Sequence, residues 1–309
     1  MSEETYLSRP WLNLYPQGTP TDIDAEYTTG LAVFDAAVAA HPHEPFLLYF
    51  DGSLSFAQVD RAARALAVTL RERGFTDGDR LALYTQNNPA FVIGMISAWR
   101  AGGTAVAINP MNKARELTYL LGDSGAVALL ALDDLYTEVA KPVIDSGKTS
   151  VTTVITSSAL DFQTRNDDRL FHGLTRLHPA GTLDLVTIID DFAGGELPAV
   201  TLSADDVAVL AYTSGTTGEP KGAINTHGNF AFNAQTYRDW TGLKPGEPIL
   251  GIAPLFHITG LVGHVMFATL AGSPLVLNHR FDPRVALDAI REHRPVFTVA
   301  AITAFNALA

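Results

Sequence analysis

The stretch GDRLALYTQNNPAFVIGMISAWRAGGTAVAINP, residues 78–110, carries the clearest signal of the fold class. It predicts a short apolar strand over residues 80–85, a helix over about residues 89–101 that stops at Gly102 and Gly103, and a second apolar strand over residues 104–109. A strand, a helix and a strand in this order indicate parallel strands with the helix packed on one face. Neither strand alternates apolar with polar residues, so we expect helices on both faces of the sheet.

The same alternation continues on both sides of this stretch. Helices are predicted over residues 59–73, 116–121, 135–145, 229–240 and 282–293, and strands over residues 126–132, 151–156, 205–212, 248–253, 273–278 and 296–302. The fold class is therefore α/β, with layered, mostly parallel sheets flanked by helices. A chain of 309 residues is expected to form two domains or subdomains. The pattern weakens between about residues 157 and 202, which suggests tentative subdomains 1–200 and 201–309.

Composition excludes several classes of protein. Hydrophobic residues make up 47% of the chain and charged residues 17%, which favours a large core over disorder. The absence of cysteine excludes disulfides and thiolate metal sites. A net charge of -12 with no basic stripe argues against a nucleic-acid partner. The sequence shows neither a secretory signal nor an uncharged run long enough to cross a bilayer, so we expect a cytoplasmic protein. Peripheral contact with a membrane and the oligomeric state are left open.

The segment YTSGTTGEPKG, residues 212–222, begins where the predicted strand 205–212 ends. Ligands of parallel α/β sheets bind beyond the carboxyl ends of the strands. Glycines allow a close backbone approach, successive N–H groups form an anion nest, and hydroxyl groups add donors and a ligand for Mg²⁺. Lys221 is one of only five lysines in this acidic chain and is suited to a phosphate oxygen. The Walker A pattern is not met, because Pro220 and Gly222 replace its second glycine and its Ser or Thr. The alternative is a surface turn.

TSGTTGEPKG resembles the signature loop of the adenylate-forming superfamily, which comprises acyl-CoA synthetases, luciferase-like enzymes and peptide-synthetase adenylation domains. Residues 78–110 and PLFHITG, residues 254–260, resemble further segments of that family in the same order. RPWLNLYPQGTP, residues 9–20, is similar to the opening of bacterial long-chain fatty acyl-CoA ligases. The resemblance implies the large N-terminal domain of these enzymes. It also implies activation of a fatty or other carboxylic acid by ATP and Mg²⁺ through an acyl-adenylate, followed by thioester formation with CoA.

The resemblance also implies roles for individual residues. Thr213 would help to hold the metal, and Lys221 would steady the loop or the phosphates as both a binding and a catalytic residue. His257 would lie beside the acyl group and the adenylate as a gate or orienting group, the alternative being a packed histidine at the start of a helix. The β- and γ-phosphates would be wrapped by Ser214, Gly215, Thr216, Thr217 and Gly218. PLFHITG lacks the aspartate that amino-acid-activating domains place there, which favours a fatty or aryl acid.

Several features of the family have no counterpart in residues 1–309. The Tyr-Gly-x-Thr-Glu and Thr-Gly-Asp stretches, the small C-terminal domain and its catalytic lysine are absent, and residues 135–139 and 76–79 are false matches. We therefore expect a truncated AMP-binding domain that is weak or inactive alone. The alternative is a non-catalytic domain of the same fold that binds a nucleotide or a partner. We interpret His227, His264 and Trp240 as structural residues, and the remaining histidines show no metal-ligand spacing.

Overall fold

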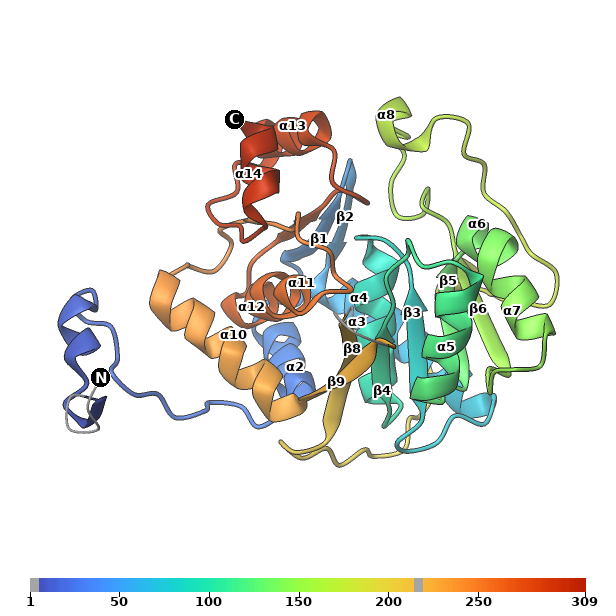
Figure 1. Cartoon of the computed structure of the whole chain (residues 1–309), viewed down its shortest axis with the longest axis horizontal. Coiled ribbons are helices and arrows are strands. Elements are labelled where there is room, and N and C mark those ends of the chain that lie inside the picture. Colours follow the sequence, from blue (N-terminus) through green and yellow to red (C-terminus); the bar gives the residue numbers. More distant parts are fainter. Residues whose placement is uncertain (1–5, 214–218) are drawn as a thin grey trace.

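Two β-sheets organise the protein, whose computed structural model describes residues 6–213 and 219–309 (Figure 1). The larger sheet has seven strands in the order β7-β6-β5-β3-β4-β8-β9, and the smaller has four in the order β10-β11-β1-β2. The strands are β1 (Pro45–Tyr49), β2 (Gly52–Ser55), β3 (Arg80–Tyr84), β4 (Thr104–Ala107), β5 (Ala128–Leu132), β6 (Thr153–Ser157), β7 (Leu183–Asp184), β8 (Val207–Thr213), β9 (Lys221–Thr226), β10 (Ile249–Leu250) and β11 (Leu275–Leu277).

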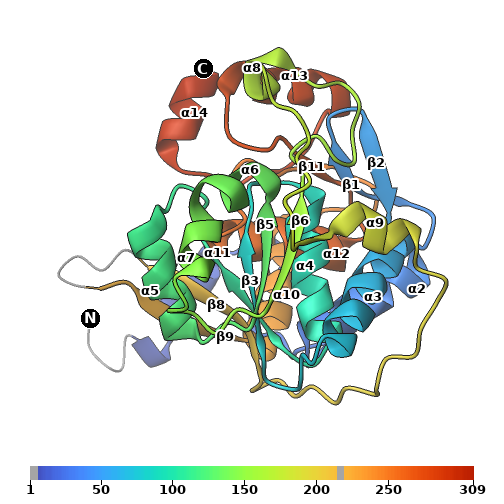
Figure 2. The same ribbon diagram turned by 90° about the vertical axis from the view of Figure 1, so that its right-hand side faces the viewer.

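The helices cover both faces of the larger sheet and fill the space between the two sheets (Figures 1 and 2). They are η1 (Pro10–Leu14), α2 (Gly30–Ala40), α3 (Phe56–Glu72), α4 (Pro89–Arg100), α5 (Ala114–Ser124), α6 (Asp133–Leu135), η2 (Tyr136–Ala140), α7 (Lys141–Asp145), α8 (Asp168–Phe171), α9 (Leu185–Asp190), α10 (His227–Thr241), α11 (Ile258–Gly260), η3 (Leu261–Met266), α12 (Phe267–Ala271), α13 (Pro283–His293) and α14 (Ile302–Leu308).

The predicted strand–helix–strand unit is confirmed as β3, α4 and β4, with β3 and β4 parallel. The helix begins after Asn88, whose side chain accepts a hydrogen bond from the Phe91 N–H at 3.2 Å, and Pro89 suits its first turn. All twelve residues of α4 are buried. A helix that is apolar on every side has to lie inside the protein, and this one lies between the two sheets.

Alternation along the strands divides the core into layers. Leu81 and Leu83 of β3 join the core between the sheets, which also contains Leu47 and Leu275 of the smaller sheet. The intervening residues Ala82 and Tyr84 face the opposite side, where α5, η2 and α7 cover the sheet. A third cluster, Leu250, Ile252, Val276, Ala286 and Ala289, joins the outer face of the smaller sheet to α13. Helix layers and strand layers thus alternate through the protein, as the α/β prediction implied.

The chain changes direction within the larger sheet next to β3. Both β4 and β5 pair with β3, so β5, β6 and β7 extend the sheet on the side of β3 opposite to β4, whereas β8 and β9 later extend it beside β4. The helix α4, which precedes β4, packs on one face of the sheet, and α5, which follows it, packs on the other. Such a switch point leaves a crevice at the carboxyl ends of the strands, where ligands bind in open α/β sheets.

Several elements differ from the sequence predictions, beginning with α2, β1 and β2, which precede the first predicted helix. Residues 221–226 form β9, an antiparallel edge strand that was not predicted, because its exposed and mixed composition gives no apolar signal. Residues 296–302 were predicted as a strand, but the structure has a single parallel bridge between Phe297 and Ile249. The weak region between residues 157 and 202 contains α8, β7 and α9.

The boundary expected near residue 200 does not separate the two sheets. The larger sheet contains β8 and β9 in addition to β3 to β7, and the smaller sheet joins β1 and β2 to β10 and β11. Each sheet therefore combines strands from before and after residue 200. Subdomains 1–200 and 201–309 as separate folding units stay a prediction.

Candidate active site

The described ends of the segment 212–222 form a β-hairpin. Thr213, the last residue of β8, pairs with Lys221, the first residue of β9, and Tyr212 pairs with Gly222. Directly paired residues point to the same face of a sheet, so Thr213 and Lys221 share one face of the hairpin, and both are exposed. The predicted phosphate-binding residues Ser214, Gly215, Thr216, Thr217 and Gly218 lie outside the described residues.

A cavity of about 390 Å³ lies at this end of the hairpin. Its walls come from the carboxyl ends of β4 and β8, from α5 and from the segment that follows β10. It is lined by Ala107, Asn109, Asn112, Glu116, Leu120, Tyr212, Thr213, Pro220, Phe256 and His257. The structure therefore brings two predicted site residues, Thr213 and His257, to one cavity. Lys221 does not line it but pairs with Thr213 at its edge.

Asn87 fixes the segment that leads to His257. Its amide donates hydrogen bonds to the carbonyl oxygens of Gly251 and Ala253 at 3.0 and 2.9 Å, and its side-chain oxygen accepts one from the Leu255 N–H at 2.9 Å. Asn87 is buried and directly precedes the cap of α4. The start of a fully buried helix thus determines where the residues before His257 lie.

His257 lines the cavity and also begins a helix. It is exposed, which contradicts the alternative of a packed histidine, and its role as a gate or orienting group stays a prediction. Its Nδ1 accepts a hydrogen bond from the Thr259 N–H at 3.2 Å, which caps α11. An Nδ1 that accepts a hydrogen bond carries no proton, so the neutral ring has its proton on Nε2. The ring is exposed. His257 can therefore offer a hydrogen-bond donor to a ligand in the cavity.

The polar side chains around the cavity mostly carry oxygen atoms, and these atoms take part in hydrogen bonds. Glu116 is the charged residue among the lining residues, and its carboxylate accepts a hydrogen bond from the Lys113 N–H at 3.2 Å. The Tyr84 hydroxyl donates to the Asn112 carbonyl at 2.6 Å, and burial raises the pKa of Tyr84 to about 12. Burial and a hydrogen bond to Asp123 raise the pKa of Tyr212. Both phenols are therefore protonated donors at neutral pH, and neither is a base.

Whether a divalent metal fits this cavity depends on the atoms that the cavity residues offer as metal ligands. Across residues 6–213 and 219–309, no three His, Asp or Glu side chains come together as metal ligands. Mg²⁺ is usually bound through one or two protein oxygens together with substrate phosphates and water. The Thr213 hydroxyl suits a Mg²⁺ ion that arrives with a nucleotide, and this part of the chain contains no cage for a resident ion.

Four polar residues of the cavity were not predicted as site residues from the sequence. Asn109 and Asn112 follow β4, Glu116 lies on α5 and Tyr212 precedes Thr213. The sequence signal for the first two is INPMN after a buried strand, since polar residues at the carboxyl end of a parallel strand are typical of a site. Glu116 and Tyr212 gave no such signal, because their positions depend on how α5 packs beside the hairpin.

The histidines interpreted as structural are buried. His227 and His264 are both fully buried, and burial lowers the pKa of each to about 4. The His227 ring packs edge-on against Trp99 with ring centroids 5.1 Å apart. Trp240 packs less than expected, because 52% of it is exposed while its ring contacts Tyr15 edge-on.

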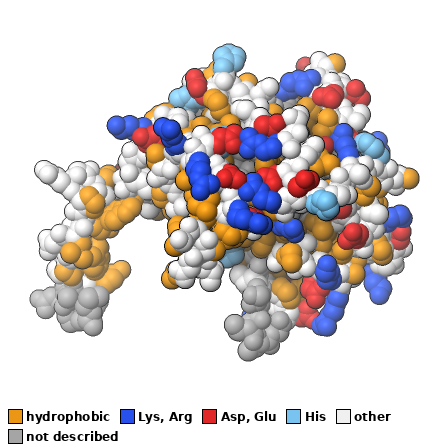
Figure 3. All heavy atoms as spheres, turned by 90° about the horizontal axis from the view of Figure 1, so that it is seen from above, with side chains coloured by type: hydrophobic (Ala, Val, Ile, Leu, Met, Phe, Trp, Pro, Cys, Tyr) orange, Lys and Arg blue, Asp and Glu red, His pale blue; other side chains and the backbone are white. Residues whose placement is uncertain are grey.

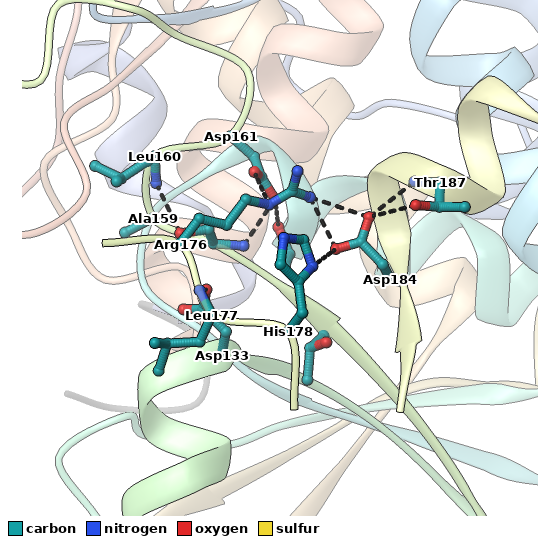
Figure 4. Close-up of polar contacts among 12 residues, drawn as sticks. Asp133, Ala159, Leu160, Asp161, Arg176, Leu177, His178, Asp184 and Thr187 are labelled. Atoms are coloured by element: carbon teal, nitrogen blue, oxygen red, sulfur yellow. Dashed lines mark hydrogen bonds and ion pairs between the residues drawn. The ribbon is translucent and has the colours of Figure 1, made fainter. Parts of the chain in front are cut away.

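A second polar cluster lies at the carboxyl ends of β6 and β7, and its side chains bind one another (Figure 4). Asp161 accepts hydrogen bonds from the Ser158 N–H at 2.7 Å and the Ser157 hydroxyl at 3.0 Å. Arg176 bridges Asp161 and Asp184, with contacts of 3.2 and 2.8 Å. These internal pairs make the cluster a structural tie for residues 158–184.

Comparison with known proteins gives a consistent family and fold. The model of the AMP-binding enzyme family matches residues 34–309. A long-chain-fatty-acid–CoA ligase of Bacillus subtilis is 29% identical over 97% of this chain and 55% of that protein. A feruloyl-CoA synthase of Amycolatopsis is 32% identical over 87% of this chain and 48% of that protein. The chain thus spans about half the length of the curated relatives it matches.

Solved structures show the same fold. A long-chain-fatty-acid-CoA ligase from Archaeoglobus fulgidus superposes with a TM-score of 0.78 at 26% identity, covering 95% of this chain and 55% of that one. An anthranilate CoA ligase in complex with anthranoyl-AMP superposes with a TM-score of 0.76 at 22% identity, covering 93% of this chain and 52% of that one.

Within the described part of the chain, every helix is too short or too polar to cross a membrane.

Proposed function

The chain belongs to the family of AMP-binding enzymes, and from that membership we propose that it acts in an acyl-CoA ligase. The ligase would join a carboxylic acid to CoA with the conversion of ATP to AMP and pyrophosphate. The observation that carries the proposal is the cavity at the carboxyl ends of β4 and β8, where Thr213 and His257 meet. Because this chain spans about half of its relatives, the proposed reaction is that of the complete ligase.

The proposed reaction has two steps. A carboxylate oxygen of the acid forms a bond to the α-phosphorus of ATP, the bond from that phosphorus to the bridging oxygen breaks, and pyrophosphate leaves with the electron pair. The CoA sulfur, after loss of its proton, then forms a bond to the acyl carbon, and AMP leaves. The first step brings two anions together, and unit charges about 4 Å apart repel by roughly 4 kcal/mol at an effective dielectric constant near 20.

The hairpin offers the groups that would offset this repulsion. Thr213 and Lys221 lie side by side on one exposed face, so a hydroxyl and an ammonium group are available to the same anion. Fixed donors aimed at developing charge are often the largest contribution to catalysis. We assign phosphate binding to Thr213 and Lys221 and extend it to Ser214, Gly215, Thr216, Thr217 and Gly218. Mg²⁺ would enter with ATP, with Thr213 as a ligand, and would neutralise phosphate charge.

His257 and the apolar wall of the cavity suit the acid. Phe256, Leu120 and Ala107 supply apolar surface, and the His257 Nε2 proton is a donor for a carboxylate or an adenylate oxygen. The described lining residues contain no aspartate, and the carboxylate of Glu116 among them accepts a hydrogen bond from the Lys113 N–H. We therefore propose a fatty or aryl acid without an amino group as the substrate. A cytoplasmic location, with or without peripheral membrane contact, goes with this proposal because ATP and CoA are the co-substrates.

The first test measures binding of Mg²⁺–pyrophosphate to the 309-residue chain by calorimetry. Lys221→Ala is expected to raise Kd roughly 10- to 100-fold, because a hydrogen bond to a charged group is lost. Lys148→Ala is the matched control, since Lys148 is also exposed but follows α7 and belongs neither to the hairpin nor to the cavity. In the complete ligase, Lys221→Ala and Thr213→Ala should each slow adenylate formation by ~10²–10³-fold.

Equal pyrophosphate affinities of the Lys221 and Lys148 variants would contradict the assignment of the hairpin to phosphate binding. Acid-dependent exchange of labelled pyrophosphate into ATP separates the ligase from a non-catalytic binding domain. We expect weak or no exchange by the 309-residue chain alone. Exchange at full rates by this chain would contradict that expectation.

A further inference from the structure

We propose that Tyr119 and Asp123 of α5 are positioning residues that hold both strands of the hairpin carrying Thr213 and Lys221. This inference rests on the proposed function, because it gives α5 a part in phosphate binding. Neither residue lines the cavity. They would act by fixing where the ends of β8 and β9 lie relative to the cavity.

Two hydrogen bonds connect α5 to the hairpin, one on each side of it. The Tyr212 hydroxyl, next to Thr213, donates a hydrogen bond to the Asp123 carboxylate at 2.6 Å. The Tyr119 hydroxyl donates to the carbonyl oxygen of Pro220, next to Lys221, at 3.0 Å. The partners are 89 and 101 residues apart in sequence. Both sides of the hairpin are thus attached to one helix at the residues adjacent to the predicted phosphate ligands.

One face of α5 both forms the cavity wall and holds the hairpin. Glu116 and Leu120 line the cavity, whereas Tyr119 and Asp123 make the two hydrogen bonds. Positions 116, 119, 120 and 123 follow the spacing i, i+3, i+4 and i+7, which places them on one side of a helix. The wall and the hairpin therefore have a common rigid reference.

The rest of α5 is anchored to the sheet. Leu117 and Leu121 are fully buried in the core on this face of the sheet. The helix ends at Gly125 with φ 60°, a conformation that a glycine adopts readily. The edge strand β9, by contrast, is largely exposed and pairs with β8 on one side. A helix anchored through four buried residues thus supports the end of a hairpin whose second strand, β9, has no buried residue.

The geometry of Tyr212 depends on its partner across the strands. Tyr212 pairs with Gly222, and a Cβ at position 222 would lie 3.2 Å from the Tyr212 ring. The glycine leaves the ring free to lie over β9 and to reach α5. Burial, the hydrogen bond to Asp123 and the charge of that carboxylate raise the pKa of Tyr212, so its hydroxyl remains a donor at neutral pH.

The test uses three variants: Tyr119→Phe, Asp123→Asn and the double variant that carries both changes. Each is compared with the control variant Asp145→Asn. Asp145 is a matched control, because its exposed carboxylate also accepts one side-chain hydrogen bond at 2.6 Å, from Lys141, and lies outside the cavity. Hydrogen exchange of the amides that pair β8 with β9 is expected to be about tenfold faster in Asp123→Asn and faster still in the double variant. Ultraviolet titration should show lower pKa values for Tyr212 and Tyr119 in Asp123→Asn, because the Asp123 carboxylate contributes to raising the pKa of both. Unchanged exchange relative to Asp145→Asn would overturn the proposal.

The second readout is Mg²⁺–pyrophosphate affinity of the same chains. We expect Kd to rise about 5- to 20-fold in the double variant and to stay unchanged in Asp145→Asn. Faster exchange with unchanged affinity would overturn the positioning role and leave a purely structural contact. If the unaltered chain binds no pyrophosphate, the phosphate assignment itself fails, and the exchange result then shows separately whether α5 holds the hairpin.

Discussion

Three buried histidines make the stability of this protein sensitive to acid. Burial lowers the pKa of His227 and His264 to about 4 and that of His279 to about 3. In the unfolded chain the pKa of histidine is about 6.5, so the unfolded state binds protons that the folded state does not. Their contribution to stability is therefore complete above about pH 6.5 and is lost as the pH falls toward 4.

The prediction at the residue scale concerns His227, neither of whose ring nitrogens has a hydrogen-bond partner among residues 6–213 and 219–309. When the pH falls from 7 to 4, His227 takes up a proton more readily in the unfolded chain than in the folded one. This difference should lower the free energy of unfolding by about 3 kcal/mol. His227→Phe keeps an aromatic ring against Trp99 and cannot titrate. Urea unfolding at several pH values should show a flatter pH profile for this variant. The same profile as in the unaltered protein would contradict the pKa shift.

At the scale of elements, glycines decide where segments can approach each other. Gly52 of β2 lies against the backbone of the segment after β6, and a Cβ there would meet the Phe162 carbonyl oxygen at 1.8 Å. Phe162 has φ 64°, so this segment already has an unusual backbone conformation. Gly122, in contrast, is an exposed residue of α5, and a Cβ added there would meet no atom within 4 Å.

These two glycines give opposite predictions. Gly52→Ala should lower the free energy of unfolding by about 3 kcal/mol or more, because a backbone atom has to move. Gly122→Ala should raise it by about 0.5 kcal/mol, since alanine favours the helix and meets nothing. Thermal and urea unfolding of both variants measures the difference. Equal effects would show that the close approach of residue 162 to β2 is wrong.

The elements also differ in how well the sequence predicted them. The helix α4 was predicted within one residue at each end, because Asn88, Pro89 and the two glycines mark its limits. The strand β9 was missed, because Lys221 to Thr226 is mostly exposed and its apolar residues do not mark a core. Its existence depends on pairing with β8 and not on its own composition.

At the scale of the whole molecule, residues 158–184 connect the two sheets. Asp51, after β1, accepts hydrogen bonds from Thr164, which lower the pKa of Asp51 to about 2. Arg165 forms two hydrogen bonds of 2.8 Å with Glu292 of α13, and Arg169 pairs with Asp288 at 2.7 Å. Basic and acidic side chains accordingly lie next to each other on the face shown in Figure 3.

At this scale we predict that the ion pair between Arg165 and Glu292 contributes little to stability and that its contribution depends on salt. In a double-mutant cycle, Arg165→Ala and Glu292→Ala should show a coupling energy of about 0.5–1 kcal/mol, since both side chains are more than a third exposed. The coupling should shrink at high salt, because exposed charges are screened. Lys141 and Asp145, one helical turn apart on α7, provide a control pair within a single element. A coupling that is independent of salt would contradict this account.

Local sequence was sufficient to predict the α/β class and the β3–α4–β4 unit, because the spacing of apolar residues and the stop signals of the helix lie in one continuous stretch. The resemblance to adenylate-forming enzymes pointed to Thr213 and His257, which line one cavity, and their roles stay a prediction. Only the folded chain shows that β8 and β9 form a hairpin, that Lys221 stands beside Thr213, and that α5 holds both sides through Tyr119 and Asp123. Those contacts with α5 join residues about a hundred positions apart, and no local pattern records such pairs, because they depend on how separate elements pack around a common core.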